Sequence, residues 1–250
     1  MTVAALRAAE AGGLLPVTDA ASSHVGKVRA SNEDAFVIRP EAGLWAVADG
    51  MGGLARGEWA SGVIVRALDD LRFTGAPRAD QALLTDAIEA ANAAVHGQAG
   101  AYGAAIGSTV VALLLRDGRF SVTWAGDSRA YRLRDDRLDQ LTRDHTQVQD
   151  RVDRGLLTPA EARAHPMAHV LTRAVGVQAI LELDSAEGAA RTGDVFLLCS
   201  DGLHGVAGDD EIAAILRSGE PQSACDRLVA LCLAKGAPDN VTVVVAAVEG

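Results

Sequence analysis

Short apolar runs separated by turn-forming residues predict β-strands along most of the chain. Seven such runs are rich in β-branched, aromatic and other apolar residues. The predicted strands are Ala35–Ile38, Leu44–Ala48, Thr109–Leu115, Phe120–Ala125, Ala130–Leu133, Val195–Cys199 and Val241–Val248. Because the middle strands follow one another through short turns, we expect mainly antiparallel pairing rather than a doubly wound parallel sheet.

The segment around Asp117-Gly118 carries the clearest strand signal. This dipeptide lies between two apolar runs and is typical of a two-residue hairpin turn. In the run that follows, Phe120–Trp124, large apolar residues alternate with Ser121 and Thr123. A period of two residues predicts a strand that buries one face and leaves the other partly exposed.

Apolar residues at three- to four-residue spacing predict helices in four further segments. The predicted helices are Gly57–Leu71, Asp80–His96, Asp209–Leu216 and Gln222–Lys235. Gly236 directly follows the last of them, as glycine often does at the end of a helix. Thr158-Pro159-Ala160-Glu161 is typical of a capping box with proline at the first helical position. Strands and helices in this order indicate an α+β fold.

Composition and charge narrow the class of protein. The chain has 250 residues, of which 49% are hydrophobic, and a formal net charge of −10. This composition is typical of a folded globular protein, and its acidity argues against nucleic acid or an anionic membrane as a partner. Neither a linker nor an internal repeat is visible, so we expect residues 1–250 to form a single domain with residues 1–16 as a flexible lead-in.

The number of cysteines and the length of the apolar stretches indicate the cellular compartment of the protein. The three cysteines, Cys199, Cys225 and Cys232, are too few and too scattered for a disulfide framework. No apolar stretch is long enough for a membrane-spanning helix, and Arg7 and Glu10 interrupt the N-terminal segment that a signal peptide would need. We therefore expect a cytoplasmic protein.

Acidic residues stand at the ends of the predicted strands. Asp49, Asp127 and Asp201 each follow an apolar run closely, whereas Glu33-Asp34 and Asp239 precede one. Taken singly, each is also typical of a turn or a helix cap. Together they place negative charge at the rim of the sheets, where a bound divalent cation would compensate it. Ligands that are all oxygen favour Mg²⁺ or Mn²⁺ over zinc.

Nine short motifs occur in one order along the chain. They are R-A-S-N-E-D-A (Arg29–Ala35), V-A-D-G-M-G-G (Val47–Gly53), G-E-W-A-S (Gly57–Ser61), G-S-T (Gly107–Thr109), A-G-D-S-R (Ala125–Arg129), L-T-R-D-H-T (Leu141–Thr146), V-L-T-R-A-V-G (Val170–Gly176), C-S-D-G-L (Cys199–Leu203) and D-N-V-T (Asp239–Thr242). Together they resemble the metal-dependent PPM family, the type 2C serine/threonine protein phosphatases, in its short bacterial form. The resemblance runs from Ser23 to Val248 and implies two antiparallel β-sheets packed as a central sandwich with helices on both sides.

The resemblance implies a binuclear metal site. Asp49 would bridge two Mn²⁺ or Mg²⁺ ions. The carbonyl of Gly50 would bind one of them, and Asp201 and Asp239 would bind the other. Two further acidic residues would act mainly through metal-bound waters, Glu33 and Asp34. In bacterial relatives, the positions that match Asp127 and Asp201 can hold a third, weaker ion.

The reaction that the resemblance implies is direct hydrolysis of a phosphate ester. A hydroxide bridging the two ions would attack phosphorus, with no phosphoenzyme. Arg29 matches the family's phosphate-binding arginine, although an arginine near a strand start is more often part of a surface ion pair. The expected protein is a serine/threonine protein phosphatase that acts on phosphorylated proteins and opposes a bacterial serine/threonine kinase.

Residues from Arg143 to Gly176 match the family's flap, a segment beside the active site that helps select substrates. The charged and proline-broken sequence of this segment is consistent with a surface element. Thr172 and Arg173 would either help receive a phosphopeptide or pack against the sheet, and the sequence leaves both open.

Two departures from the family leave the general acid open. The catalytic histidine of eukaryotic relatives is replaced by Met51, and that of many bacterial relatives by Leu54. A serine or threonine alkoxide needs protonation, so a metal-bound water or a histidine from elsewhere would supply the proton. His165 and His169 could bind zinc if they lay on one helix, but Pro166 argues against this, and we expect both in a mobile loop.

Three other functions have some support. A pseudophosphatase that binds phosphoproteins without hydrolysing them would keep the fold, but the presence of Asp49, Asp201 and Asp239 argues against it. A calcium-binding structural domain is disfavoured because the closely spaced D-x-D-x-D-G loop is missing. A small-molecule phosphatase would carry the same motifs, so the substrate stays open within the enzyme class.

Overall fold

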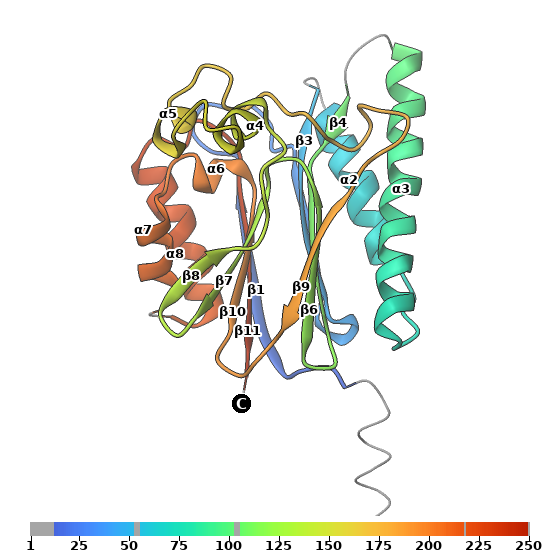
Figure 1. The fold of residues 1–250 in the computed structure, drawn as a ribbon, viewed down its shortest axis with the longest axis vertical. Helices are drawn as coiled ribbons and strands as arrows, with labels where there is room; N and C mark the ends of the chain where they lie inside the picture. Colours follow the sequence, from blue (N-terminus) through green and yellow to red (C-terminus); the bar gives the residue numbers. More distant parts are fainter. Residues whose placement is uncertain (1–12, 53–55, 103–105, 218, 250) are drawn as a thin grey trace, which may run out of the picture.

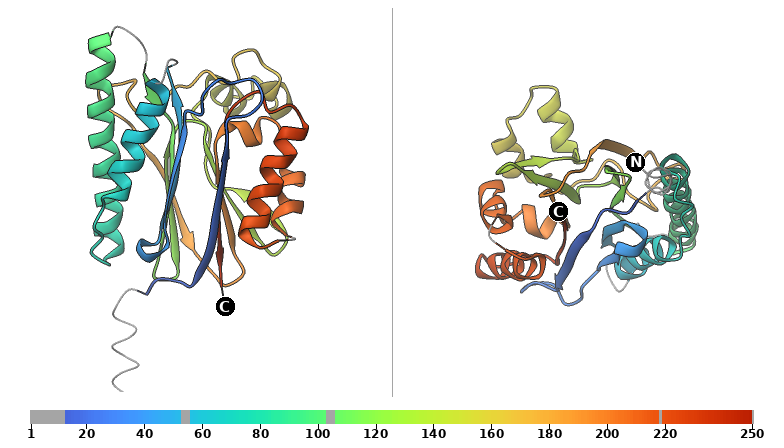
Figure 2. Two further views of the ribbon diagram at one scale, coloured as in Figure 1. Left: turned by 180° about the vertical axis from the view of Figure 1, so that it is seen from behind. Right: turned by 90° about the horizontal axis from the view of Figure 1, so that it is seen from below.

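Two antiparallel β-sheets pack face to face, and helices cover the outer face of each (Figure 1, Figure 2). The computed structural model describes residues 13–52, 56–102, 106–217 and 219–249. The predicted α+β sandwich is confirmed. In this described part of the chain, we find no helix with the length and apolar character needed to cross a bilayer.

The sheets have separate sets of strands. The first sheet has the order β1-β11-β10-β7-β8. Its strands are β1 (Val17–His24), β11 (Val241–Val248), β10 (Val195–Cys199), β7 (Arg129–Arg134) and β8 (Arg137–Gln140). The second sheet has the order β2-β3-β5-β6-β9, with β4 paired to β3. Its strands are β2 (Asp34–Arg39), β3 (Leu44–Met51), β5 (Val110–Arg116), β6 (Arg119–Ala125), β9 (Asp184–Ala189) and β4 (Gly107–Ser108).

Burial on both faces explains why the central strands are continuous apolar runs. Along β11, every second residue from Val241 packs under the helices, and residues between them, such as Val244, pack against the other sheet. Trp45 and Phe196 are the largest fully buried inter-sheet side chains, and burial of a side chain of this kind stabilises the fold by about 1.5–3 kcal/mol. Trp45 Nε1 also donates to Asp19 Oδ2 at 2.8 Å, which ties the two sheets together.

Helices cover the outer faces, and three short helices lie at one end. α2 (Arg56–Asp69) and α3 (Pro77–Tyr102) cover the second sheet, whereas α7 (Asp209–Leu216) and α8 (Pro221–Ala234) cover the first. The other helical segments are α4 (Gln147–Asp153), α5 (Pro159–Arg163), α6 (Asp201–His204) and the 3₁₀ turn η1 (Pro40–Ala42). The capping box at Thr158 is confirmed, because Thr158 and Glu161 each accept a hydrogen bond from the other's backbone N–H.

The β5–β6 hairpin agrees with the prediction in its turn and only in part in its exposure. Asp117 and Gly118 have positive φ angles of 51° and 66°, as a tight hairpin turn requires. Thr123, however, is buried, because Gln81 of α3 donates to its Oγ1 at 2.7 Å and accepts from Ser121 Oγ at 2.6 Å. The prediction of a partly exposed polar face on β6 is therefore confirmed at Ser121, which is half-buried, and wrong at Thr123, which α3 covers with a polar side chain.

The predicted elements are all present, with ends shifted by up to a few residues. The sequence analysis did not predict β1, β4, β8, β9, α4 or α6. β1 has few large apolar residues and depends on its pairing with β11, from Val17 opposite Val248 to His24 opposite Val241. Just before β1, the Pro16 carbonyl accepts from Glu249 N at 2.8 Å, so the end of the predicted flexible lead-in contacts the sheet. Residues 1–12 lie outside the described residues.

Candidate metal centre

The acidic residues at the strand ends meet at one end of the sandwich. In the antiparallel β2–β3 pair, Asp34 lies directly opposite Asp49. A cavity of about 630 Å³ opens at this end of the sheets, next to α6. The predicted site residues that line it are Arg29, Glu33, Asp49, Gly50, Asp127, Asp201 and Asp239. Five of these residues, Glu33, Asp49, Asp127, Asp201 and Asp239, are ones that the argument from strand ends singled out, whereas Arg29 and Gly50 were expected from the family resemblance.

One carboxylate oxygen of Asp34 accepts a hydrogen bond, and the other has no hydrogen-bond partner among the described residues. Ser200 Oγ donates to Asp34 Oδ2 at 2.8 Å, whereas Oδ1 is buried and lacks a hydrogen-bond partner among the described residues. Burial raises the pKa of Asp34 to about 7, and the charges of Asp201 and Asp239 add to this. A buried carboxylate oxygen without a partner is unfavourable, so this atom indicates a ligand at the site.

The pKa values of Asp49 and Asp127 are also raised. Burial is the largest cause for both carboxyl groups. Neighbouring negative charges add to it, those of Asp34 and Asp201 at Asp49 and those of Asp201 and Asp144 at Asp127. Like charges in a poorly hydrated place favour proton uptake, and a divalent cation at the same place would favour the ionised forms instead.

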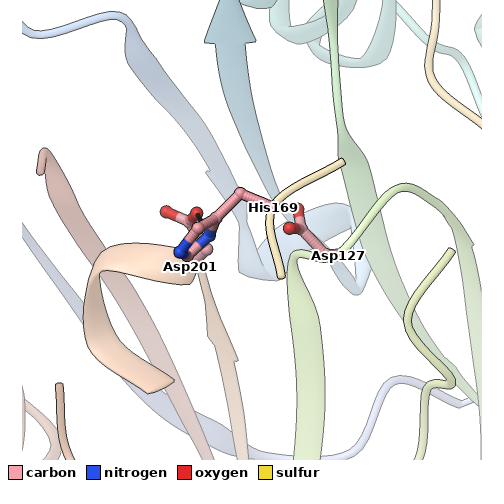
Figure 3. A group of neighbouring side chains, drawn as sticks. All are labelled: Asp127, His169 and Asp201. Carbon is pink, nitrogen blue, oxygen red and sulfur yellow. Dashed lines mark hydrogen bonds and ion pairs between the residues drawn. The ribbon is translucent and has the colours of Figure 1, made fainter. Parts of the chain in front are cut away.

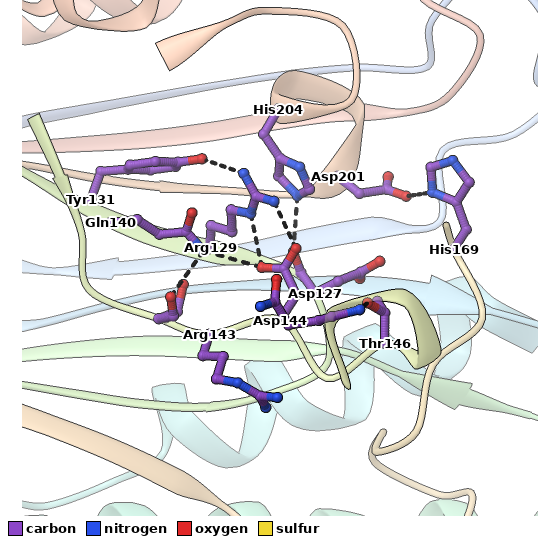
Figure 4. Close-up of polar contacts among 12 residues, drawn as sticks. Asp127, Arg129, Tyr131, Gln140, Arg143, Asp144, Thr146, His169, Asp201 and His204 are labelled. Atoms are coloured by element: carbon purple, nitrogen blue, oxygen red, sulfur yellow. Dashed lines mark hydrogen bonds and ion pairs between the residues drawn. The ribbon is translucent and has the colours of Figure 1, made fainter. Parts of the chain in front are cut away.

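Asp201 differs because two histidines lie beside it. Burial alone would raise its pKa, but the hydrogen bond from His169 and the charges of His204 and His169 outweigh burial and lower the pKa. His169 Nδ1 donates to Asp201 Oδ2 at 3.1 Å (Figure 3), and this bond raises the pKa of His169. Burial lowers the pKa of His204 to about 4, and its Nε2 donates to the Asp127 carbonyl at 2.9 Å (Figure 4).

Two glycines allow the site's backbone segments to approach closely. A Cβ on Gly50 would lie 2.1 Å from the carbonyl oxygen of Gly57 at the start of α2. A Cβ on Gly202 would lie 1.9 Å from the carbonyl oxygen of Asn240. Neither distance leaves room for a carbon atom, so only glycine lets α2 and α6 pack against the segments that carry Asp49 and Asp239.

Asn240 holds the metal-site loops together, a role that the sequence analysis missed. Its Oδ1 accepts from Glu33 N at 2.8 Å, and its Nδ2 donates to the carbonyls of Val25 and Ser31, both at 2.9 Å. It therefore fixes residues 25–33, which include Arg29 and Glu33, to the start of β11. The position of Asn240 directly after Asp239 in the D-N-V-T motif was the sequence signal that could have revealed this role.

Arg29 pairs with Asp239. Its Nη2 lies 2.6 Å from Asp239 Oδ2, and its side chain is 57% exposed. The hydrogen bond and the charge of Asp239 raise the pKa of Arg29. A guanidinium that lines the cavity and remains accessible suits a phosphoryl group, and the same contact is also a surface ion pair, so both predicted roles remain open.

Thr172 and Arg173 lie away from the cavity. Arg173 Nη1 donates to Asp184 Oδ1 at 2.8 Å, and Thr172 N donates to the His145 carbonyl at 2.8 Å. Neither residue lines the cavity. The Arg173 contact joins the segment from Arg143 to Gly176 to β9, which favours packing against the sheet for Arg173, whereas the Thr172 bond links two parts of the segment itself.

His169, by contrast, lies at the cavity. Sequence spacing alone could not predict that His169 lines the cavity. Its position depends on the path of the chain up to Leu171, and Leu171 pairs with Thr146 in an isolated bridge. His165 contacts Arg151, whereas His169 contacts Asp201. Met51 lines the cavity, whereas Leu54 lies outside the described residues.

The donors around the cavity fit hard divalent cations. The cavity is lined by the carboxylates of Asp49, Asp201 and Asp239 and by Gly50, which can offer its carbonyl oxygen. The partnerless oxygen of Asp34 and the raised pKa values show that negative charge at this place exceeds what the described residues compensate. Such an all-oxygen set suits Mg²⁺ or Mn²⁺.

Comparisons with known proteins agree with this chemistry. A sequence profile of the protein phosphatase 2C family matches residues 22–231. The serine/threonine protein phosphatase PstP of Mycobacterium tuberculosis is 43% identical over 231 residues, which cover 91% of this chain but only 44% of PstP. PppA, described as a key regulatory component of T6SS in Pseudomonas aeruginosa, has a TM-score of 0.88 and 43% identity, over 93% of this chain and 98% of that one. The catalytic domain of PstP in complex with two manganese ions has a TM-score of 0.83 and 40% identity, over 94% of this chain and 99% of that one.

Proposed function

The chain belongs to the protein phosphatase 2C family, and we propose that it is a metal-dependent serine/threonine protein phosphatase. It hydrolyses phosphoserine and phosphothreonine in proteins. The observation that carries this proposal is the group of acidic side chains around one cavity. In the described part of the chain, Asp34, Asp49 and Asp127 take part in no ion pair, so their charge is available to cations.

Two Mn²⁺ or Mg²⁺ ions are held by Asp49, the Gly50 carbonyl, Asp201 and Asp239. The similar PstP catalytic domain with two manganese ions supports this number. When bound, the ions activate a water as the nucleophile and neutralise charge on the phosphoryl oxygens. Glu33 and Asp34 act through waters, and the partnerless Asp34 Oδ1 is an acceptor for one. Asp127 and Asp201 are the candidates for a third ion.

Arg29 binds the phosphoryl group of the substrate. Its present partner in a 2.6 Å contact is Asp239. A cation bound at Asp239 would compensate the negative charge of this carboxylate and so weaken its attraction for Arg29. The exposed guanidinium then has donors for two phosphoryl oxygens. Arg29 therefore orients the ester and balances the charge that develops during attack.

The natural substrates are phosphoproteins, and a bacterial serine/threonine kinase is the expected opposing enzyme. The names of PstP, a serine/threonine protein phosphatase, and of the protein phosphatase PhpP of Streptococcus pneumoniae support the protein substrate class. We further propose a cytoplasmic location, a single domain over the chain, and a flap formed by the segment from Arg143 to Gly176. This segment brings His169 and Leu171 to the cavity, where they can contact a peptide.

Hydrolysis of a phosphothreonine peptide and of p-nitrophenyl phosphate tests the proposal. Each substrate is assayed in EDTA, in Mg²⁺ and in Mn²⁺. We expect turnover of both substrates with either metal and none in EDTA. Asp139→Asn is a matched control, since Asp139 lies in a surface pair with Arg132 and Arg137 and should not affect turnover.

The other outcomes separate the alternatives. Turnover of the aryl ester alone, across a panel of phosphopeptides, would favour a small-molecule phosphatase. Metal binding without turnover of either substrate would favour a pseudophosphatase. Turnover that persists unchanged in EDTA would contradict a metal-dependent reaction.

A further inference from the structure

A second cavity lies at the far end of the sandwich from the metal centre. It has a volume of about 630 Å³ and opens between the start of α3 and the β5–β6 hairpin (Figure 1). β5 connects the two ends, because Thr109 just before it lines the metal-centre cavity and Arg116 at its last position lines the second one. At about 3.3 Å per residue of strand, the two are about 20 Å apart. The second cavity is thus separate from the metal centre, and its size is within the range of small-molecule sites, about 300–1,000 Å³.

Three arginines line this second cavity, although the chain has a net charge of −10. Arg116 and Arg119 lie directly opposite each other in the β5–β6 pair, where like charges destabilise a hairpin. Arg78 lies in the first turn of α3, where the helix dipole disfavours a cation. Residues that oppose the local electrostatics in this way are typical of a functional site, and an anion bound among them would relieve both conflicts.

Two of the arginines have charge available for a ligand. Arg78 is exposed and takes part in no hydrogen bond or ion pair with the residues that the structure describes. Arg119 pairs with Glu187 at 3.6 Å, and both side chains are more than half exposed, so this pair is weak. Glu187 also lines the cavity, from β9, and an exposed carboxylate can turn away when an anion binds to Arg119.

Arg116 forms the buried part of the arginine group. Its side chain is only 10% exposed, and its Nη2 donates to the Ala42 carbonyl at 2.8 Å. Its Nε, however, is buried and has no hydrogen-bond partner in the described ranges of the chain. Asp80 lies 3.5 Å from this Nε, but its carboxylate accepts hydrogen bonds from Thr74 and Gly75 instead. A buried donor without an acceptor is unfavourable and is a second indication that a ligand with acceptor atoms binds here.

We propose that the second cavity binds a small molecule that carries a phosphate group. Arg78 and Arg119 donate to the phosphoryl oxygens, as guanidinium groups do in phosphate sites. The start of α3, a helix of 26 residues, adds its dipole to the attraction. Ala76 and Pro77 line the same cavity and offer apolar contacts to the rest of the molecule. The inference does not depend on the proposed function, because none of these residues belongs to the metal centre.

A binding experiment with phenyl phosphate tests this inference without any turnover. The full chain is labelled with ¹⁵N and titrated in EDTA, and the shifts of its backbone amide signals show where the probe binds and with what Kd. Arg78→Ala and Arg119→Ala each remove one exposed guanidinium. Arg137→Ala is the matched control, because Arg137 is 81% exposed and pairs with Asp139 in the other sheet. Phenol serves as the uncharged control ligand.

We expect saturable shifts at Arg78, Gly118 and Arg119 in the unaltered chain and in Arg137→Ala. Arg78→Ala and Arg119→Ala should each bind phenyl phosphate at least about tenfold more weakly, because each loses charge-assisted hydrogen bonds to the phosphate. Phenol should cause no saturable shifts, since the arginines recognise the charged group.

Three results would overturn the inference. These are an equal Kd for Arg119→Ala and the unaltered chain, shifts confined to the metal-centre loop at residues 29–33, and equal binding of phenol and phenyl phosphate. The proposed function is tested separately, by metal-dependent turnover, and would be unaffected by any of them.

Discussion

Arg129 and Asp144 lie beside the cavity, and they contrast with the carboxylates that line it (Figure 4). The pair has two contacts, Nε to Oδ1 at 2.8 Å and Nη2 to Oδ2 at 2.7 Å. Tyr131 and Gln140 add a hydrogen bond each, to Arg129 and Asp144 respectively. Burial alone would lower the pKa of Arg129, but the contacts with Asp144 and Tyr131 outweigh burial and raise it. Every charge in this group is thus balanced by a neighbour within the chain.

The cavity carboxylates have no such balance. Asp34, Asp49 and Asp127 are poorly hydrated, close to further negative charge, and outside every ion pair of the described residues. A balanced buried pair contributes to a unique fold, whereas an unbalanced group destabilises the fold until a ligand binds. The difference separates residues that stabilise the structure from residues that serve chemistry, although both groups contain shielded carboxylates and Asp127 is close to Arg129 in the chain.

The largest expected effect comes from removing a charge that the proposed reaction uses. Asp201→Asn should reduce kcat by at least about 10³-fold, or about 4 kcal/mol in activation free energy, because a metal ligand is lost. Steady-state turnover of the phosphothreonine peptide at saturating Mn²⁺ measures this. Activity close to that of the unaltered chain would remove Asp201 from the metal centre.

Breaking the balanced pair should act on stability instead. Asp144→Ala leaves Arg129 shielded and without its partner, so the free energy of unfolding should fall by about 3–5 kcal/mol. Urea unfolding in EDTA measures this without any contribution from metal. A loss of less than about 1 kcal/mol is usual for an exposed pair and would show that the Arg129–Asp144 pair does not stabilise the fold as a buried pair.

Arg29→Ala should have a smaller effect, on the substrate rather than on the fold. Loss of a charge-assisted contact to phosphate is expected to lower kcat/KM by about 10–100-fold, which corresponds to about 1.5–3 kcal/mol. Arg29→Lys keeps the charge without the planar fork, so it should restore only part of this loss. If kcat/KM for the phosphopeptide stays unchanged in Arg29→Ala, Arg29 serves only as the ion-pair partner of Asp239.

The smallest expected effect is a pH dependence of the metal-free protein. The pKa of Asp34 is about 7 in the fold, above its value of about 4 in an unfolded chain, so the folded state binds the proton more tightly. Stability in EDTA should therefore fall as pH rises from about 5 to about 7, by at most about 1.4 kcal/mol per pH unit for one group, and then level off. Saturating Mn²⁺ should abolish the decline, because it favours the ionised carboxylates.

Urea unfolding at several pH values measures this, and Asp34→Asn should reduce the slope in EDTA. A metal-free protein that gains stability over the same range of about pH 5 to 7 would show that the paired carboxylates dominate the dependence.

The sequence predicted which carboxylates meet at the cavity better than it predicted their surroundings, for a physical reason. Asp49 follows an apolar run directly and Asp201 follows one after Ser200, and such runs end at the rim of a sheet whatever the details of packing. β1 and β9 have small and polar residues, so only pairing with β11 and β6 defines them as strands. Their prediction would have required knowledge of the partner strand.

Long-range contacts limited the prediction of the site in the same way. His169 meets Asp201 across 32 residues of chain, through a path that no local pattern encodes. The role of Asn240 could have been predicted from the sequence, because this amide side chain comes directly after Asp239. In the structure it binds the backbone at Ser31 and Glu33. The burial of Thr123 depended on Gln81, a single polar residue on the covering helix.

Thermal unfolding of the unaltered chain and of Asp49→Asn, each in EDTA and in saturating Mn²⁺, tests most directly whether the carboxylates are unbalanced and kept for cations. Without metal, Asp49→Asn should have the higher Tm, because it removes one of several like charges that lie close together. With Mn²⁺, the order should reverse, since an ion at about 100 times its Kd stabilises the unaltered chain by about 2.7 kcal/mol and the variant by much less. A lower Tm for Asp49→Asn in EDTA, together with an equal gain from Mn²⁺ in both proteins, would contradict the account.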